Sequence, residues 1–436
     1  MQTLVASCLL TLALGGPPNE VNAKDYWPQW RGPLATGVAP NANPPVEWSE
    51  NKNIRWKAAL PGKGHSTPII WADRIFLTTA IPFGEPVKPR FVRPGAHDNN
   101  EMTQAHEFAV LAVDRKSGKI IWQQTVNKAV PHEAGHMTAS MASASPVTDG
   151  EHVFAFFGSY GLYCLDFDGK LIWKKDLGQM YTKHGHGEGS SPALYGDTLI
   201  INWDQEEQSF LVALDKRTGK QRWRVARPEE TSWATPIVVE HAAKMQVVVS
   251  GTNRIRGYDL ATGEVIWECG GLSSNIVASP VAADGFVYAG SSYDTRAMLA
   301  VKLDGAKGDI TGTNQVVWTR QRGTPYVPSP LLYDDTIYNL QHYQGVVVRI
   351  NAKTGHDEGE PIRLPAIRDV YSSPVAAAGR IYITSRDGVT QVLSHQDPTK
   401  SLAVNRLDDR FSASAALVGR ELYLRGEKHL YCIAED

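Results

Sequence analysis

The sequence predicts an all-β fold: a single eight-bladed β-propeller of four-stranded antiparallel blades over residues 24–436. Three observations lead to this prediction. A strand that opens with small residues and a proline recurs along the chain, and most copies lie 42 to 50 residues apart. Apolar and polar residues alternate between the copies, and a tryptophan closes several of them. A period in the low-to-mid forties built from alternating strands is typical of a propeller blade.

The proline strands mark the innermost strand of each predicted blade. Successive copies begin 78, 46, 44, 44, 50, 44 and 42 residues apart. The copies are Ser66-Thr67-Pro68, Ala144-Ser145-Pro146, Ser190-Ser191-Pro192, Ala234-Thr235-Pro236, Ala278-Ser279-Pro280, Pro328-Ser329-Pro330, Ser372-Ser373-Pro374 and a degenerate Ser414-Ala415-Ala416.

A tight turn followed by tryptophan marks the outer half of a blade. The clearest case runs from Asp215 through Gly219 to Trp223. The aspartate is suited to accept backbone N–H groups at the start of the turn, and the glycine takes the positive-φ position. We expect the tryptophan to lie on the outer strand and to pack between neighbouring blades. The same pattern occurs at Asp114, Gly118 and Trp122 and at Asp259, Gly263 and Trp267.

The two ends of the repeat array predict how the propeller closes. Residues 53–57 look like a fourth strand with its own tryptophan but no preceding blade, whereas the last repeat, residues 411–433, lacks a fourth strand. We therefore expect the N-terminal strand to complete the last blade and remove an exposed edge. The long first interval indicates an insertion at residues 81–106, expected as a surface loop of blade 1.

Residues 1–23 are predicted to be a signal peptide, which indicates a periplasmic or extracellular protein. Residues 4–14 are an apolar stretch too short to span a bilayer, and small residues stand before Lys24. A lipobox-like sequence before Cys8 leaves lipid anchoring as an alternative. No later segment has the character of a transmembrane helix.

Cys164, Cys269 and Cys432 remain after the predicted cleavage, and an odd number cannot all pair internally. Cys164 and Cys432 occupy a repeat position that is alanine in other copies. We expect small, buried strand residues rather than a redox pair.

The charge of the chain argues against a nucleic-acid partner. Its formal net charge is −2, and no dense run of Lys or Arg occurs. A nucleic-acid-binding surface needs a basic face that displaces counterions. We expect a monomer whose partner is a protein, a carbohydrate or another small ligand.

The recurring A-x-D-x-x-[ST]-G-x-x-x-W pattern resembles the tryptophan-docking repeat of the pyrroloquinoline-quinone-like propellers. The resemblance covers nearly the whole predicted mature chain, and residues 27–33 look like the start of a group of secreted bacterial members. Related propellers include quinone-dependent alcohol dehydrogenases and the propeller lipoprotein of the outer-membrane β-barrel assembly machinery. The dehydrogenases carry adjacent cysteines over their quinone, and this chain has no adjacent cysteines. We therefore expect no bound pyrroloquinoline quinone.

One face of the predicted propeller carries the candidate binding residues. The loops leading into the innermost strands and the loops between strands two and three surround the channel on that face. The predicted ligand or partner residues are His65, Trp233, Tyr326, His342, Tyr371 and Arg386, with Asp204, Tyr293, Tyr343 and Phe411 on the same loops. The alternative is that these side chains only fill the mouth of the channel.

A divalent metal site is a further hypothesis. His132 to His136 match H-E-x-x-H, but this zinc motif works on a helix, and here a proline precedes it in a loop between blades. A second loop brings more imidazoles and a carboxylate, and together the two loops offer ligands for a transition metal. The predicted ligands are His132, His136, His184, His186 and Glu188. The alternative is a polar loop that binds no metal.

These features favour an exported, non-catalytic binding or scaffold propeller acting through the channel mouth. A quinone-dependent dehydrogenase and a polysaccharide-acting hydrolase or lyase are the alternatives, since propellers host both binding sites and active sites. No catalytic residue is assigned. The sequence shows no G-x-S-x-G, P-loop or C-x-x-C motif, and Asp166 to Gly169 are read as a hairpin turn rather than as a calcium loop.

Overall fold

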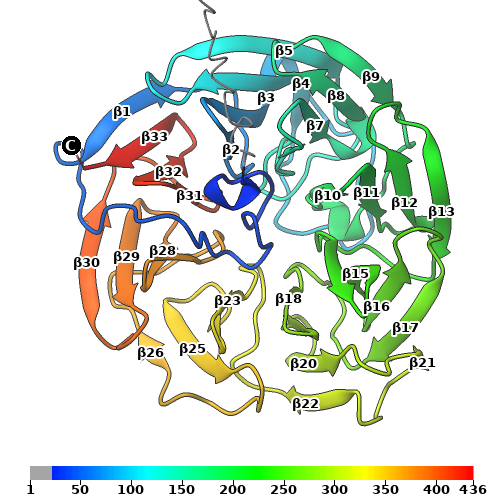
Figure 1. The fold of residues 1–436 in the computed structure, drawn as a ribbon. Coiled ribbons are helices and arrows are strands. Elements are labelled where there is room, and N and C mark those ends of the chain that lie inside the picture. The colour runs from blue at the N-terminus through cyan, green and yellow to red at the C-terminus, as the bar shows by residue number, and fades with distance from the viewer. Residues whose placement is uncertain (1–21, 436) are drawn as a thin grey trace, which may run out of the picture.

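The computed structural model describes residues 22–435, and these form a ring of eight sheets around a central channel (Figure 1). The predicted eight-bladed propeller is therefore confirmed. The blades follow one another around the ring in chain order, from blue to red. Cys8 lies outside the described residues, and so does the predicted signal peptide except for its last two residues, 22 and 23. None of the helical turns within residues 22–435 has the length and apolar character needed to cross a membrane.

In each of the first four blades the strands run outward from the channel in chain order. Blade 4 also carries a short fifth strand, paired in parallel. The strands are β2 (Ile69–Trp71), β3 (Arg74–Val87), β4 (Thr103–Asp114) and β5 (Ile120–Ala129) in blade 1; β6 (Val147–Thr148), β7 (His152–Phe156), β8 (Leu162–Asp166) and β9 (Leu171–Lys175) in blade 2; β10 (Ala193–Tyr195), β11 (Thr198–Trp203), β12 (Ser209–Asp215) and β13 (Gln221–Arg227) in blade 3; and β14 (Ile237–His241), β15 (Lys244–Gly251), β16 (Arg254–Asp259), β17 (Val265–Gly270) and β21 (Gly308–Asp309) in blade 4.

The last four blades repeat this order, except that the outermost strand of blade 8 comes from the N-terminal part of the chain. The strands are β18 (Val281–Ala283), β19 (Phe286–Ser291), β20 (Ala297–Lys302) and β22 (Val316–Arg320) in blade 5; β23 (Leu331–Tyr333), β24 (Thr336–Leu340), β25 (Val346–Asn351) and β26 (Ile362–Arg363) in blade 6; β27 (Val375–Ala377), β28 (Arg380–Thr384), β29 (Val389–Ser394) and β30 (Ser401–Arg406) in blade 7; and β31 (Ala416–Val418), β32 (Glu421–Arg425), β33 (His429–Ala434) and β1 (Ile54–Ala59) in blade 8. The short 3-10 turns are η1 (Ala23–Asp25), η2 (Gly158–Tyr160) and η3 (Lys183–Gly185).

The ring closes as the sequence predicts. Strand β1 pairs antiparallel with β33, from Ala59 opposite His429 to Ile54 opposite Ile433. The last blade thus gains its fourth strand from the opposite end of the chain, and the edge of β33 is covered.

Tryptophans join neighbouring blades through the aspartate turns. The Trp173 indole of blade 2 donates a hydrogen bond of 2.8 Å to the carbonyl of Lys216 in blade 3. Its ring lies against Gly219, where an added Cβ would stand 2.8 Å from a ring carbon. The turn needs glycine both for this contact and for its φ of +67°. The same indole-to-carbonyl bond occurs from Trp56 to Arg115, Trp122 to Phe167, Trp223 to Leu260 and Trp318 to Ala352.

The N-terminal residues 27–39, called the plug segment here, cross one end of the channel (Figure 1). Trp27 is fully buried and exchanges two backbone hydrogen bonds with Ile70 of blade 1. The Arg31 guanidinium donates to the carbonyls of Pro330 and Pro374, at 2.6 and 2.7 Å. The segment therefore ties blade 1 to blades 6 and 7 and fills the channel at that end.

The insertion in blade 1 is not all loop. Residues on both sides of it extend β3 and β4 into a long hairpin, with Val87 still opposite Thr103. What remains is a loop at residues 88–102, called the insertion loop here. It turns back onto the propeller, since Phe91 N–H donates to the His132 carbonyl and Asn100 N–H to the Gly135 carbonyl.

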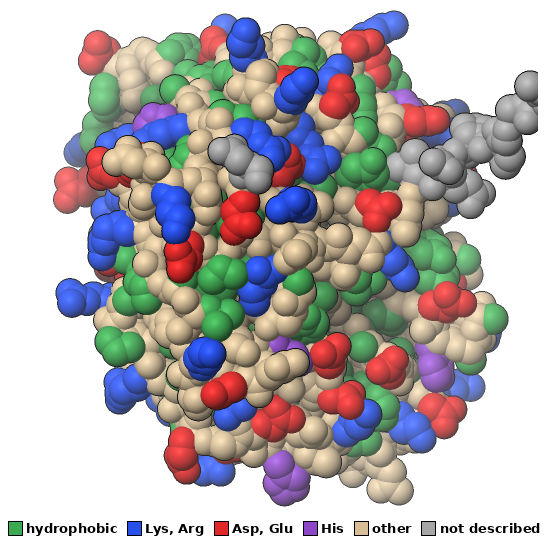
Figure 2. Space-filling model, turned by 60° about the vertical axis from the view of Figure 1, so that its left-hand side comes forward, with side chains coloured by type: hydrophobic (Ala, Val, Ile, Leu, Met, Phe, Trp, Pro, Cys, Tyr) green, Lys and Arg blue, Asp and Glu red, His purple; other side chains and the backbone are tan. Residues whose placement is uncertain are grey.

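Cys164, Cys269 and Cys432 are buried free thiols, which confirms the expectation of small strand residues. Burial raises the pKa of the Cys269 thiol to about 11 and that of the other two to about 12. On the surface, Figure 2 shows basic and acidic side chains interspersed rather than gathered by sign. The visible face thus lacks the one-sign patch that a nucleic acid needs.

Candidate functional site

A pocket of about 320 Å³ occupies the channel mouth at the end opposite the plug segment. We call it the mouth pocket. Trp30 of the plug segment lines both this pocket and a small cavity toward the other end, so its indole separates the two. The channel is therefore a blind well that opens on one face. Loops of blades 1 to 3 bring histidines to its wall, and loops of blades 5 to 7 bring tyrosines.

The floor of the well is a ring of hydroxyl groups from the proline strands. In each step the backbone N–H of one blade donates to the hydroxyl oxygen of the next, as Ser329 N–H does to Ser373 Oγ at 2.9 Å. Seven such steps run from Thr67 to Ser414. The eighth, from Ser414 back to Thr67, is not formed, and the buried Thr67 Oγ1 has no hydrogen-bond partner among the described residues.

Four imidazoles gather on the wall formed by blades 1 to 3. The ring centroid of His97 lies 4.5 Å from that of His184 and 5.2 Å from that of His186. His136 lies 4.8 Å from His186. Burial lowers the pKa of His186 to about 4 and also lowers the pKa values of His136 and His184, so these rings are neutral at pH 7.

This cluster holds the insertion loop in place. His186 Nε2 lies 3.1 Å from the carbonyl oxygen of His97, and Asn99 donates to the His184 carbonyl at 2.6 Å. Met137 N–H donates to the Asp98 carbonyl. The loop therefore forms one side of the pocket mouth.

The opposite wall is a stack of aromatic rings. Tyr326 stacks on His342 at 4.9 Å, and Tyr343 stacks on Tyr371 at 5.0 Å. The Arg386 guanidinium lies 4.6 Å over the Tyr371 ring and is held by Asp369 at 3.0 Å. Burial raises the pKa of Tyr326 and of Tyr343, so this wall presents uncharged phenols.

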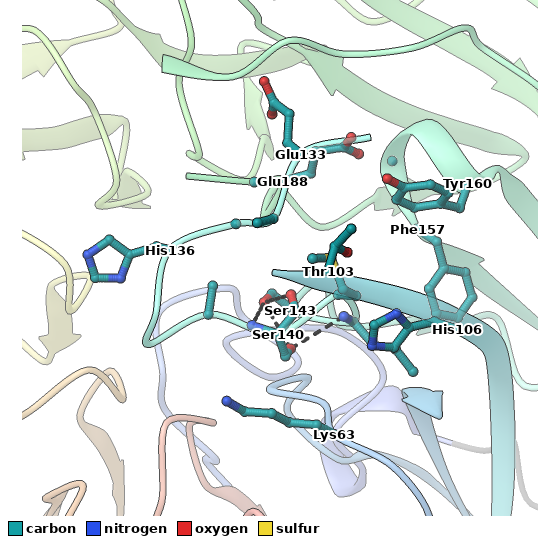
Figure 3. A pocket seen from close by; sticks show the side chains of 18 of the residues that line it. Lys63, Thr103, His106, Glu133, His136, Ser140, Ser143, Phe157, Tyr160 and Glu188 are labelled. Atoms are coloured by element: carbon teal, nitrogen blue, oxygen red, sulfur yellow. Dashed lines mark hydrogen bonds between the residues drawn. The ribbon is translucent and has the colours of Figure 1, made fainter. Parts of the chain in front are cut away.

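A second cavity of about 400 Å³ lies beside the mouth pocket, under the insertion hairpin; we call it the side cavity. It shares His136, His186 and Glu188 with the mouth pocket. Figure 3 shows Glu133 and Glu188 near one another above this cavity and the His136 ring turned away from them. Burial raises the pKa of Glu133, and it raises the pKa of Glu188 to about 8.

The carboxyl group of Glu188 is held by two hydrogen bonds from Ser159. The Ser159 N–H donates to Glu188 Oε2 at 2.6 Å, and the Ser159 hydroxyl donates to Oε1 at 2.5 Å. Gly158 leaves the room that the carboxyl group needs, because a Cβ there would lie 1.1 Å from Glu188 Oε2. Glu188 is thus a fixed part of the wall.

The five residues of the metal hypothesis are not brought to one point. His136, His184 and His186 lie together, whereas Glu188 faces Ser159 and His132 contacts the Met180 carbonyl and the Tyr160 hydroxyl. Their alternative hydrogen-bond partners are the physical reason. Among residues 22–435, no group of three or more His, Cys, Asp or Glu is arranged to hold a metal ion. Metal binding by the neighbouring histidines stays a prediction.

The residues predicted for the mouth face lie mostly where the repeat phase put them. His65, Trp233, Tyr326 and Tyr371 line the mouth pocket, as do Tyr293 and Tyr343. His342 and Arg386 stack on residues of the wall. Asp204 and Phe411 differ from the expectation because both are buried inside the ring. Asp204 forms a fully buried ion pair with Arg227 at 2.7 Å, and Phe411 packs against Tyr431.

Three components of the site were not predicted: His97, Trp30 and Asn275. All three line the mouth pocket. His97 lies in the insertion, outside the repeat, and Trp30 precedes the first blade. The position of Asn275 just before the Ala278-Ser279-Pro280 strand was the available signal, since that loop leads into an innermost strand.

Comparisons with known proteins agree with this architecture. The family model described as outer membrane protein assembly factor BamB matches residues 106–268 and 208–436. BamB of Yersinia pestis is 23% identical over 249 residues, which are 53% of this chain and 57% of that protein. The match thus spans little more than half the length of that relative.

Solved structures share the fold at low identity. The structure of BamB from Moraxella catarrhalis has a TM-score of 0.55 and 16% identity, and the match covers 81% of this chain and all of that one. Quinohemoprotein alcohol dehydrogenase from Comamonas testosteroni has a TM-score of 0.59 and 10% identity over 95% of this chain and 81% of its own. The family model matches the chain from residue 106 to the C-terminus, and the fold has eight blades. The chain therefore belongs to the outer membrane protein assembly factor BamB family of propellers.

Proposed function

We propose that this protein is an exported binding propeller that holds a ligand or partner in its channel mouth and catalyses no reaction itself. The observation that carries the proposal is the blind well. The plug segment fills one end of the channel, so whatever binds must enter from the face that carries the aromatic and histidine side chains. Concave, largely preformed pockets with a few placed polar groups are typical ligand sites.

The family supports a binding role over an enzymatic one. The relatives matched by family model and by sequence are named as assembly factors, and a scaffold of this kind acts by contact. The name of those relatives also supports a location beyond the inner membrane, in the periplasm or outside the cell. A protein segment is therefore one class of occupant for the mouth.

The side chains of the well do not suit pyrroloquinoline quinone, an anion with three carboxylates. Among the described residues that line the mouth pocket, none is Lys or Arg. Cationic side chains, arginine above all, are the usual partners of carboxylates. The sequence also lacks adjacent cysteines. These points support a propeller without a quinone.

Photo-cross-linking tests where partners bind. A photoreactive phenylalanine replaces Tyr293 at the mouth or, as the matched control, Tyr195 at the far turn of blade 3; their exposed fractions are 41% and 44%. The protein is expressed in the periplasm of a Gram-negative host. We expect adducts from position 293 and few from position 195. Equal labelling from both positions would remove the mouth as the binding site.

A reconstitution assay tests the absence of catalysis. The purified chain is incubated with pyrroloquinoline quinone and calcium, and dye-linked oxidation of short alcohols is followed. We expect no turnover above that of quinone and calcium alone. Sustained turnover would replace the binding proposal with a dehydrogenase.

A further inference from the structure

We infer that the mouth pocket takes a neutral saccharide, recognised by the five ring hydroxyls that line the pocket and by the aromatic wall beside them. The inference rests on the proposed function and names the ligand class of the same site. Four observations carry it: hydroxyl donors without an acceptor, two unpaired buried atoms, stacking rings, and a lining that contains no Lys or Arg.

The floor offers hydroxyl donors. Each of the seven bonded hydroxyl oxygens in the ring accepts a backbone N–H, and none of them donates to another described residue. Five of the ring hydroxyls line the pocket: Ser145, Ser191, Thr235, Ser373 and Ser414. Their O–H groups are therefore left to point at whatever occupies the well. A hydroxylated ligand suits this floor because its oxygens can accept the hydrogen bonds that these O–H groups are free to donate.

The wall offers acceptors. The Asn275 side chain lines the pocket, is 5% exposed, and has no partner for its Oδ1 among the described residues. His65 lines the pocket as well, and its Nε2 is likewise buried without a partner. At the rim, Asp98 of the insertion loop adds a carboxylate. Sugar hydroxyls can donate to all three groups.

The aromatic side chains provide flat apolar faces. Trp233 on one wall and Tyr326, Tyr343 and Tyr371 on the other line the same well, and Trp30 closes its bottom. Aromatic rings combine a large apolar face with a polar edge. The C–H face of a pyranose packs on such a ring while its hydroxyls, which radiate from the sugar, meet groups on every side.

Charge and shape separate a saccharide from the alternatives. A phosphorylated or carboxylated ligand needs Lys or Arg, and the described lining has neither. The nearby Arg386 lies over Tyr371 and is already paired with Asp369. An extended peptide binds best along a strand edge, where its backbone groups meet a row of partners. The hydroxyls of the floor instead form a circle, which matches a compact ring better than a line.

The test is a titration of the full mature chain with maltose, cellobiose and lactose, followed by saturation-transfer NMR and calorimetry. Cellobiouronic acid serves as the anionic counterpart, and an uncharged hexapeptide represents a protein segment. We expect at least one neutral disaccharide to bind and to exceed both of these probes in affinity.

A matched pair of ring variants separates contact from structure. Ser373→Ala and Ser329→Ala each remove a hydroxyl that accepts one backbone N–H, but only Ser373 lines the mouth pocket, whereas Ser329 lines the cavity near the plug segment. Loss of one hydrogen bond to the ligand weakens binding about three- to tenfold for Ser373→Ala. Ser329→Ala is expected to leave the affinity unchanged.

Two results would overturn the inference. One is tighter binding of the hexapeptide or the uronic acid than of every neutral disaccharide; the other is equal weakening by both serine variants. If no disaccharide binds while position 293 still cross-links a partner, the saccharide inference fails and the binding function stands. If the cross-linking fails as well, both fall.

Discussion

At the scale of single residues, burial sets the charge of the site. Glu188 and His186 are two positions apart in the sequence, and both line the mouth pocket and the side cavity. Desolvation raises the pKa of the glutamic acid to about 8 and lowers that of the histidine to about 4. Near neutral pH both groups are therefore largely uncharged, and each links stability to pH with the opposite sign.

Glu188→Gln is expected to raise stability more at pH 8 than at pH 5. The folded protein keeps the Glu188 proton while the unfolded chain has lost it, so stability falls as pH rises between about 4.5 and about 8, by at most about 1.4 kcal/mol per pH unit. Glutamine is neutral and removes this dependence. Thermal unfolding at both pH values measures the effect, with the exposed Glu264→Gln as control. An equal shift at the two pH values would contradict the buried neutral acid.

His186→Gln is expected to reduce the loss of stability on acidification. The unfolded chain binds a proton near pH 6.5, but folded His186 resists it until about pH 4, so stability is lost as pH falls through this window. His97, His136 and His184 surround the ring, and Trp233 lies at 6.4 Å.

Hydrogen exchange between pH 7 and pH 4.5 reports the local effect. In the wild type we expect faster exchange over residues 88–102 at the lower pH, corrected for the intrinsic rate, because protonated imidazoles repel each other under the insertion loop. The exposed His356→Gln is the control and should behave like the wild type. Unchanged protection of this loop at pH 4.5 would show that the cluster does not hold it.

At the scale of elements, five of the described blades are joined to the next one by a tryptophan that donates to its turn. Trp267 differs from the expectation, because its indole donates to Gln246 of its own blade. The repeat made the blades themselves predictable, because the spacing of proline, aspartate, glycine and tryptophan gives strand order and phase directly. The insertion was less predictable. Its hairpin continues strands that also belong to the repeat, and its loop is held by backbone bonds to residues such as Gly135 and His132 that no periodicity announces.

Gly219→Ala is expected to destabilise the protein more than Gly196→Ala does. Both glycines are in blade 3 and have positive φ, +67° and +54°, so an alanine costs about 1–2 kcal/mol of backbone strain at either position. At Gly196 the new methyl group meets open space, whereas at Gly219 it meets the Trp173 ring. Overpacking adds about 1–3 kcal/mol. Denaturant unfolding of the two variants gives the difference, and equal midpoints would mean that the ring contact is unimportant.

At the scale of the whole molecule, residues 22–59 stabilise the ring in two ways. Residues 27–39 fill the channel, and β1 completes the last blade. The second was predictable from an unmatched strand at each end of the repeat array. The first was not, because Arg31 donates to backbone carbonyls of blades 6 and 7, about 300 residues or more away in the sequence, and no charged partner reveals these bonds.

Deleting residues 24–60 is expected to lower the melting temperature sharply. The deletion uncovers the edge of β33, removes Trp56 from its contact with blade 1, and opens the channel. Calorimetry of the truncated protein measures the effect. Adding a peptide of residues 24–60 should restore much of the loss, since the missing contacts are non-covalent. An unchanged melting temperature would contradict closure by β1.

The pairing of β1 with β33 also imposes an order in time. Between Ala59 and His429 lie roughly 370 residues. A ribosome adding roughly 5–20 residues per second needs roughly 20–70 seconds to make that stretch. Strand β1, made first, therefore has no partner until β33 has been made. Neither the pairing of β1 with β33 nor the closed ring around the mouth pocket exists before then. Until its two ends meet, the open edge of β33 is free to pair with strands of other chains.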